Sequence, residues 1–372
     1  MRQFKLGSAL LVTMILAGCG GGSDVPAKPK FASQVSFGDS LSDVGSYNVG
    51  MVSGLGGGQF TINAASSVKA VTPTNWTEFT SLSLGLGMPC AAQTGLDNGS
   101  GAAPGTPAGT VVPVTNYPGC TGYAQGGSRV TLQPGIGNHL VTTGGFALTV
   151  PVATQISNHL ATHATPNAPG KFTGNEIVLV MAGANDVFYQ AASISAGLPA
   201  ASGVAAVQTA ATELANDVKS QIIGNGAKYV VVANIPDISV TPYGVSLGAS
   251  VSLIDTLVTA FNAQLQADLP DSANVLNVDA YTASKDEVAN AAKYNLTNVS
   301  ATACNLNYPY NLLASSGVAN SGSSLVCNAG NLNTNVSPTD HYLFADMVHP
   351  TPYGHLLFAT YVLQAMTNKG WY

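Results

Sequence analysis

A serine that follows a short apolar segment is the first residue that could do chemistry. Residues 34–37 are predicted to form a buried strand, and the run G-D-S ending at Ser40 comes directly after it. Ligands of open α/β sheets bind outside the carboxyl ends of the strands, so Ser40 would be placed to attack a bound substrate. By itself the run is weak evidence, because Asp and Ser also cap helices.

A histidine near the C-terminus could be the base that such a serine needs. In the run D-M-V-H the carboxylate of Asp346 stands three residues before His349, so it can bind Nδ1 and leave Nε2 for the serine. Pro350 disfavours helical backbone at His349, so we expect the pair on a loop just before a last helix. Asp340 and His341 are a weaker candidate, because adjacent side chains of an extended chain point apart.

Two further runs carry groups that could stabilise a developing negative charge. The run G-A-N-D follows the apolar residues 177–181, and the side-chain amide of its Asn185 is a candidate donor. The alternative for Asn185 is an Asx turn that closes the strand. The run Y-A-Q-G-G-S, which begins at Tyr123, offers a backbone N–H, since glycine lets the backbone approach a substrate closely.

Two other patterns suggest chemistry but lack the required context. Ser246 stands in G-x-S-x-G, a motif that must follow a strand directly, and the nearest predicted strand ends well before it. His159 and His163 have the i, i+4 spacing of metal ligands, but no Glu follows His159, so we interpret them as one polar face of a helix. We therefore predict no metal site and no cofactor.

The elements that must position these residues alternate between strand and helix. Four short apolar runs are predicted to be buried strands, at residues 34–37, 177–181, 229–233 and 275–278. Helical periodicity covers about 205–223, about 247–269 and a last segment from about 352. This alternation predicts βαβ units and a mostly parallel sheet, hence a single α/β domain.

Four cysteines lie in two long segments that show no period, about 88–145 and 298–338. An even number in an exported chain favours disulfides. Three pairings are possible, and the one we expect is Cys90–Cys120 with Cys304–Cys327. Each of these bonds would close a short Gly- or Asn-rich loop. Zinc is a poor alternative because no C-x-x-C occurs.

The N-terminus has the features of an export signal. A short positive region and an apolar run are followed by L-A-G-C, so residues 1–18 are predicted to be a signal peptide. The end of this run resembles a bacterial lipobox, which would make Cys19 the lipidated first residue of the mature protein. Residues 19–30 would then be a flexible tether, and 31–372 the folded domain.

Composition excludes several classes of protein. With 12 Lys and Arg and a formal net charge of −6, the chain has no electrostatic footprint for nucleic acid. Hydrophobic residues make up 46%, which argues against intrinsic disorder and is enough for a sizeable core.

The four polar runs together resemble the SGNH/GDSL hydrolase family. The family's blocks occur here in the family's order, at residues 38–43, 123–127, 183–186 and 346–351. The resemblance spans about residue 31 to the C-terminus. It implies a three-layer α/β/α domain that is SGNH-hydrolase-like and flavodoxin-like, with long loops held by disulfides.

The resemblance also implies a role for each matching residue. Ser40 would be the nucleophile and, through its own N–H, the first oxyanion donor. The second and third oxyanion donors would be Gly127 and Asn185, and Asp346 and His349 would complete the triad. The family often has Asn before Tyr-Ala, where this chain has Gly122, and this departure leaves open whether Gly126 or Gly127 is the donor.

The implied activity is hydrolysis of carboxylic esters through an acyl-enzyme, without a cofactor. Small-molecule and lipid esters are the expected substrates, and a carbohydrate O-deacetylase or a lysophospholipase/acyltransferase is the alternative within the family. From another class, the alternative is a non-catalytic surface protein that binds glycans. We expect the protein to be a monomer that its lipid anchors in a bacterial membrane. The outer membrane is the expected one, because Gly20 rather than Asp follows Cys19.

Overall fold

A four-stranded parallel sheet forms the centre of the molecule. The computed structural model describes residues 28–99, 111–142, 145–162, 170–307, 311 and 322–372. The strand order is β1-β4-β5-β6, with bounds β1 (Ser33–Gly38), β4 (Glu176–Met181), β5 (Tyr229–Ala233) and β6 (Val275–Val278). All four predicted strands are confirmed to within one residue at each end. Their interior residues are mostly apolar because helices cover both faces of a parallel sheet.

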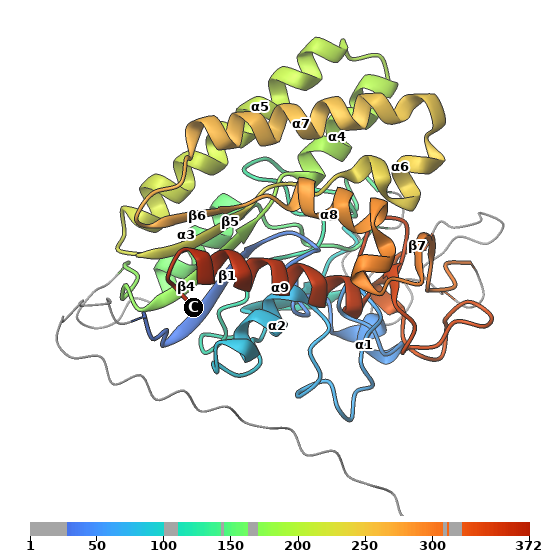
Figure 1. Ribbon diagram of the computed structural model, residues 1–372, viewed down its shortest axis with the longest axis horizontal. Helices are drawn as coiled ribbons and strands as arrows, with labels where there is room; N and C mark the ends of the chain where they lie inside the picture. The colour runs from blue at the N-terminus through green and yellow to red at the C-terminus, as the bar shows by residue number, and fades with distance from the viewer. Residues whose placement is uncertain (1–27, 100–110, 143–144, 163–169, 308–310, 312–321) are drawn as a thin grey trace, which may run out of the picture.

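Side chains alternate between the two faces of the sheet, and each face has its own helical layer (Figure 1). Val178 and Val230 pack with the first layer, and Leu179 and Val231 with the second. The first layer includes α3 (Val152–Thr162), α4 (Ala184–Ser195), α5 (Ala200–Asp217) and α7 (Val251–Asp268). The second includes α2 (Trp76–Ser83) and α9 (Pro352–Asn368), with α8 (Ala280–Ala289) beside them. The predicted α/β/α architecture is confirmed.

The predicted helices are present, with adjusted ends. Helix α5 begins at Ala200 and continues through π-helical turns at Val218–Ile223, which together contain the predicted segment. Helix α7 begins at Val251, because the residues before it form a short 3₁₀ turn. Thr351 caps α9 by accepting a hydrogen bond from the Gly354 N–H.

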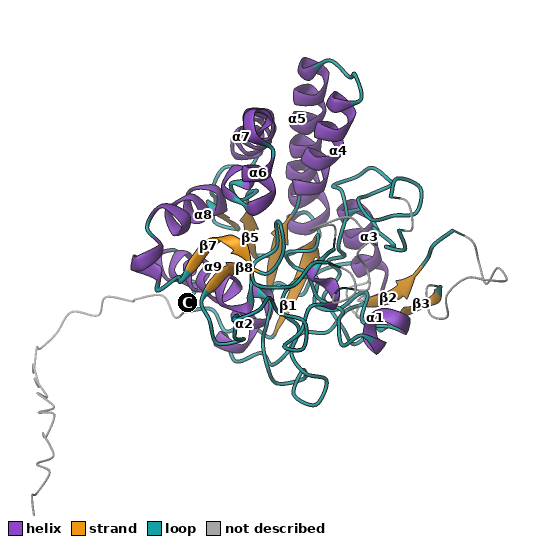
Figure 2. Cartoon of the chain, turned by 90° about the vertical axis from the view of Figure 1, so that its right-hand side faces the viewer, coloured by secondary structure: helices purple, strands orange, loops and turns teal. Residues whose placement is uncertain are grey.

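The two segments predicted as long loops contain additional strands, which corrects that expectation (Figure 2). Strands β2 (Gln93–Leu96) and β3 (Val112–Asn116) pair antiparallel, and β7 (Asn298–Thr302) pairs with β8 (Tyr342–Phe344) in parallel. The predicted disulfides Cys90–Cys120 and Cys304–Cys327 are both present. They join chain segments next to these small sheets.

Two further helices are short, α1 (Gly50–Gly54) and α6 (Pro242–Ser246). Within the described residues, no helix has both the length and the apolar composition to cross a membrane. The predicted signal peptide, Cys19 and most of the predicted tether lie outside the described residues.

Candidate active site

The turn that carries Ser40 is held by a close approach of two strands and by one glutamine. At Gly38, where β1 ends, φ is +152° and a Cβ atom would lie 2.2 Å from the carbonyl oxygen of Met181. The side chain of Gln155 on α3 accepts from the Gly38 N–H at 2.9 Å and donates to the Gly38 carbonyl at 2.8 Å. Gln155 is buried. Both the N–H and the carbonyl of Gly38 are therefore hydrogen-bonded, and this fixes the backbone that leads to Ser40.

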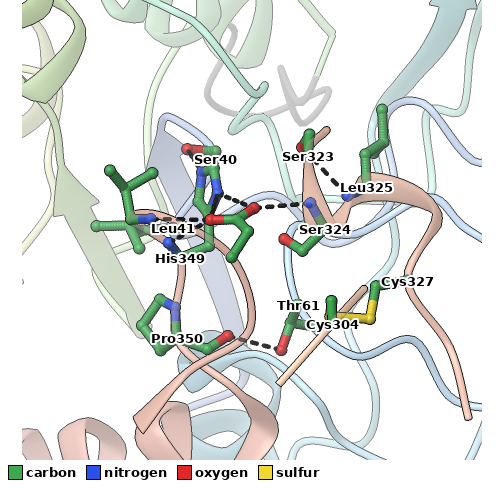
Figure 3. A network of polar contacts seen from close by, with 12 residues as sticks. Ser40, Leu41, Thr61, Cys304, Ser323, Ser324, Leu325, Cys327, His349 and Pro350 are labelled. Atoms are coloured by element: carbon green, nitrogen blue, oxygen red, sulfur yellow. Dashed lines mark hydrogen bonds and ion pairs between the residues drawn. A yellow bond between two sulfur atoms is a disulfide. The ribbon is translucent and has the colours of Figure 1, made fainter. Parts of the chain in front are cut away.

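The structure brings Ser40 and His349 together from opposite ends of the chain (Figure 3), and Asp346 contacts the same imidazole. Nε2 of His349 lies 2.8 Å from the hydroxyl oxygen of Ser40. On the other side of the imidazole, Nδ1 lies 2.7 Å from a carboxylate oxygen of Asp346. This is the arrangement in which an imidazole can take a proton from a serine while a carboxylate orients it.

Asp346 is a buried carboxylate with several donors around it. One oxygen accepts the N–H groups of Val348 and His349 at 2.9 and 2.8 Å, and the other accepts the Ser324 N–H at 2.7 Å. Burial opposes ionisation, but the charge of His349 and these hydrogen bonds outweigh it and hold the pKa of Asp346 well below its usual range. Asp346 is therefore negatively charged at neutral pH.

A disulfide joins the segment of Ser324 to residues that follow β7 and lie next to Asp346. Ser324 begins a 3₁₀ turn that ends before Cys327, and Cys327 is bonded to Cys304. The Cys304 N–H in turn donates to the carbonyl of Ala345, the residue before Asp346. Figure 3 shows Ser324 on the side of the site nearest this disulfide. The sequence contained no signal for this contact.

Asp39, the residue before Ser40, is a second buried carboxyl near the imidazole. One of its oxygens accepts the Leu41 N–H at 3.1 Å. Burial raises the pKa of Asp39 to about 7. At neutral pH the Asp39 carboxyl is therefore neutral in a substantial fraction of the molecules. Asp346 is therefore the carboxylate that carries full charge beside His349.

The hydrogen bonds of Gly126 and Gly127 indicate which of these two glycines has an N–H available for an oxyanion. The Gly126 N–H already donates to the carboxylate of Asp43 at 2.9 Å. In the described part of the chain the Gly127 N–H has no acceptor. Gly127 has φ of +81°, and a Cβ atom there would lie 1.8 Å from the Ile136 carbonyl oxygen. Glycine is thus required at 127, and its N–H is the one available to a ligand.

Asn185 lies in the first turn of α4 rather than in a loop. It is 6% exposed, and its side-chain amide donates to the Ser128 carbonyl at 2.9 Å. The next residue, Asp186, accepts hydrogen bonds from Arg129 and from the Val130 N–H at 3.0 and 2.9 Å. Two consecutive residues of α4 therefore hold the segment that follows Gly127. The Asx-turn alternative for Asn185 is not what the structure shows.

A cavity of about 420 Å³ collects these groups. Ser40, Gly127, Asn185 and His349 all line it. The rest of its wall is mostly apolar and aromatic, and includes Tyr47, Phe60, Ile136, Phe146, Phe188, Ile235, Ile238, Leu325, Phe344 and Phe358. Such a wall suits a hydrocarbon chain better than a sugar.

The rival serine and the rival histidine pair lie apart from this cavity. Ser246 ends the short helix α6, where it is exposed and its hydroxyl donates to the Tyr243 carbonyl. The ring of half-buried His341 stacks on Tyr353, and its Nδ1 contacts a backbone carbonyl. Asp340 accepts the Ser337 N–H instead of contacting His341.

The interpretation of His159 as part of a polar helix face is wrong. His159 is 4% exposed, and its ring packs against Phe37, Tyr123 and Phe172. An imidazole can pack in such an aromatic cluster because its ring is largely apolar and only its edge is polar. His163 lies outside the described residues. No group of potential metal ligands occurs in the part of the chain that the structure describes.

Comparison with known proteins assigns the chain to one family. No curated protein matches the chain significantly. The family model of GDSL-like lipases and acylhydrolases, however, matches residues 34–362, which include the strands of the central sheet and the groups around Ser40. The chain therefore belongs to the GDSL-like lipase/acylhydrolase family of hydrolases.

Proposed function

We propose that the protein is a serine esterase that hydrolyses carboxylic esters through an acyl-enzyme. The observation that supports this best is the series of contacts from Ser40 through His349 to Asp346, at 2.8 and 2.7 Å. Each distance is within the range needed for proton transfer and for orientation of the imidazole. A glycan-binding surface protein would have no use for this series.

In the proposed reaction, Nε2 of His349 takes the hydroxyl proton while Oγ of Ser40 forms a bond to the ester carbonyl carbon. The tetrahedral intermediate collapses, its C–O bond to the alcohol breaks, and the alcohol leaves with the proton from His349. Water then gives a proton to His349 and attacks the acyl-Ser40 ester. Release of the carboxylic acid returns the proton to Oγ. No cofactor enters this sequence.

Three donors are available for the oxyanion of the intermediate. The N–H groups of Ser40 and Gly127 have no acceptor within the described residues, and both residues line the cavity. The amide nitrogen of Asn185 has two hydrogens, of which the bond to Ser128 uses one. We propose that the second points to the oxyanion. The bond to Ser128 would then orient the amide before substrate binds.

The apolar wall of the cavity supports an acyl chain as the main recognised feature. Phe60, Phe146 and Phe188 line it together with aliphatic side chains. Deacetylation of a carbohydrate would require a polar surface to bind sugar hydroxyls, so we favour small or lipid esters as substrates.

Labelling with a fluorophosphonate tests the proposed function. We expect such a probe to modify Ser40 alone in the folded protein, since the reaction requires a serine activated by a base. Peptide mass spectrometry identifies the labelled residue, and heat-unfolded protein is the control. A folded protein that stays unlabelled, or that carries the label on Ser246, would contradict the assignment.

Asn185→Ala is expected to lower kcat by about 10²–10³-fold and to leave KM almost unchanged. The side-chain donor would meet an oxyanion that exists only in the transition state and the intermediate, so ground-state binding loses little. Steady-state kinetics with p-nitrophenyl esters measures both constants. The melting temperature of the same variant separates this result from a structural one, in which stability falls and kcat of the folded fraction stays normal.

We also propose that the protein is exported and held at the outer membrane by a lipid on Cys19. The lipobox-like run that ends at Cys19, and Gly20 after it, support this proposal. Cys19→Ser is expected to move the protein from the membrane fraction to the soluble one or to stall it as precursor, with esterase activity retained. Fractionation and mass spectrometry of the N-terminus measure this. Mature wild-type protein without an N-terminal acyl group would contradict the proposal.

A further inference from the structure

The cavity extends from Ser40 along one face of α8. Ala280, Ser284 and Glu287 line it, and their spacing of i, i+4 and i+7 places them on one side of that helix. Beside them the wall contains Phe344 and Phe358. Figure 1 shows α8 next to α9, whose first turns contribute to the same wall. This part of the cavity plays no role in the proposed proton transfers.

Glu287 is the unusual group in this part of the wall. It is only 8% exposed, and its carboxyl has no hydrogen-bond or ion-pair partner in the described part of the chain. The preceding residue, Asp286, is fully satisfied by contrast, because it binds Lys293 at 2.7 Å and also Tyr294 at the surface. The carboxyl oxygens of Glu287 are not among the fully buried unpaired atoms of the described residues, although the residue lines the cavity. A carboxyl that is accessible from the cavity and has no protein partner is available to a ligand that supplies one.

The protonation state of Glu287 indicates the kind of partner. Burial, and to a smaller extent the charge of Asp286, raise the pKa of Glu287 to about 8. The carboxyl is therefore mostly neutral at neutral pH, and it can both donate and accept a hydrogen bond. Asp237, the other buried carboxylate in this part of the wall, already accepts the N–H and hydroxyl of Ser239.

We propose that Glu287 is a specificity-determining residue that hydrogen-bonds a hydroxyl group of the substrate, away from the ester bond. The proposal rests on the proposed esterase function and adds a substrate class to it, esters that carry a hydroxyl on an otherwise apolar chain. The hydroxyl could belong to the acyl part or to the alcohol part. In either case the apolar wall binds the chain, and Glu287 satisfies the polar group that would otherwise be buried unpaired.

The test compares matched esters in wild type, Glu287→Gln and Glu287→Leu. The reference ester is p-nitrophenyl hexanoate. One set of probes adds a hydroxyl to the hexanoyl chain, and the other consists of hexanoate monoesters of diols, so the two sets distinguish acyl from alcohol recognition. We expect Glu287→Leu to lower kcat/KM for one hydroxylated set by about 10- to 100-fold and to leave the reference within about twofold.

Glu287→Gln should keep most of the preference, because an amide also donates and accepts hydrogen bonds. Equal losses on hydroxylated and reference esters would show a structural role and overturn the proposal, as would no loss at all. A wild-type protein that cannot hydrolyse the reference ester would contradict the proposed function itself, which is a separate result.

Discussion

Replacement of Ser40 by Ala is expected to lower kcat for ester hydrolysis by about five to six orders of magnitude. The expected loss is large because the members of a triad act as a unit, so removal of the nucleophile makes the base useless as well. The turn itself should survive, since Gly38 and Gln155 hold it through backbone hydrogen bonds that do not involve the Ser40 hydroxyl. Steady-state assays with p-nitrophenyl esters measure kcat of the variant and of the wild type.

Ser246→Ala is the matched control for this experiment. Ser246 stands in a G-x-S-x-G motif, but it is exposed and bonded to its own helix. We expect the control to keep wild-type kcat and melting temperature. If Ser40→Ala kept more than about a hundredth of the wild-type rate, Ser40 would lose its role as nucleophile.

Asp346→Asn should lower kcat by about 10⁴-fold, which is the second largest effect we expect. The carboxylate accepts from donors on both oxygens, the His349 N–H on one and the Ser324 N–H on the other. An amide has only one oxygen, so its NH₂ group must face one of these donors. Both the orientation and the charge that stabilise the imidazolium would be lost.

The same variant should also be less stable, because a donor left unpaired in a buried site costs about 1–3 kcal/mol. Kinetics and chemical denaturation of one preparation measure the two effects. Asp340→Asn is the matched control, since Asp340 precedes His341 but contacts Ser337 instead. A normal kcat in Asp346→Asn would mean that another group orients His349.

The four strands of the central sheet could be predicted because each is a short, mostly apolar run that is buried on both faces. Some helices could not, and α2 illustrates the reason. It buries Thr77, Glu78 and Thr80 beside Trp76, so most of its buried residues are polar and the apolar pattern is short. Its N-terminus is stabilised by a capping box between Asn75 and Glu78, which is a local signal too weak to define a helix alone.

A residue of the candidate site could be predicted where a motif gives both the reactive side chain and its place at the end of a strand or before a helix. Ser40, Asn185, Asp346 and His349 are predictable in this way. In the structure Ser40, Asn185 and His349 line one cavity, and Asp346 contacts His349 behind it. The contacts that hold them could not be predicted. Gln155 comes from α3, and its bond to Gly38 joins residues 117 positions apart. Only tertiary structure determines such partners.

The contact between Ser40 and His349 joins residues 309 positions apart, and this separation has a consequence for biosynthesis. A chain that grows from its N-terminus contains the serine early, but β1 lacks its neighbour β4 until much of the chain has been made. The histidine follows only just before α9, the last helix. Since domains fold as units and long-range contacts form late, a nascent or truncated chain has a serine without its base. The hydrolase would therefore become reactive only after synthesis and folding are complete.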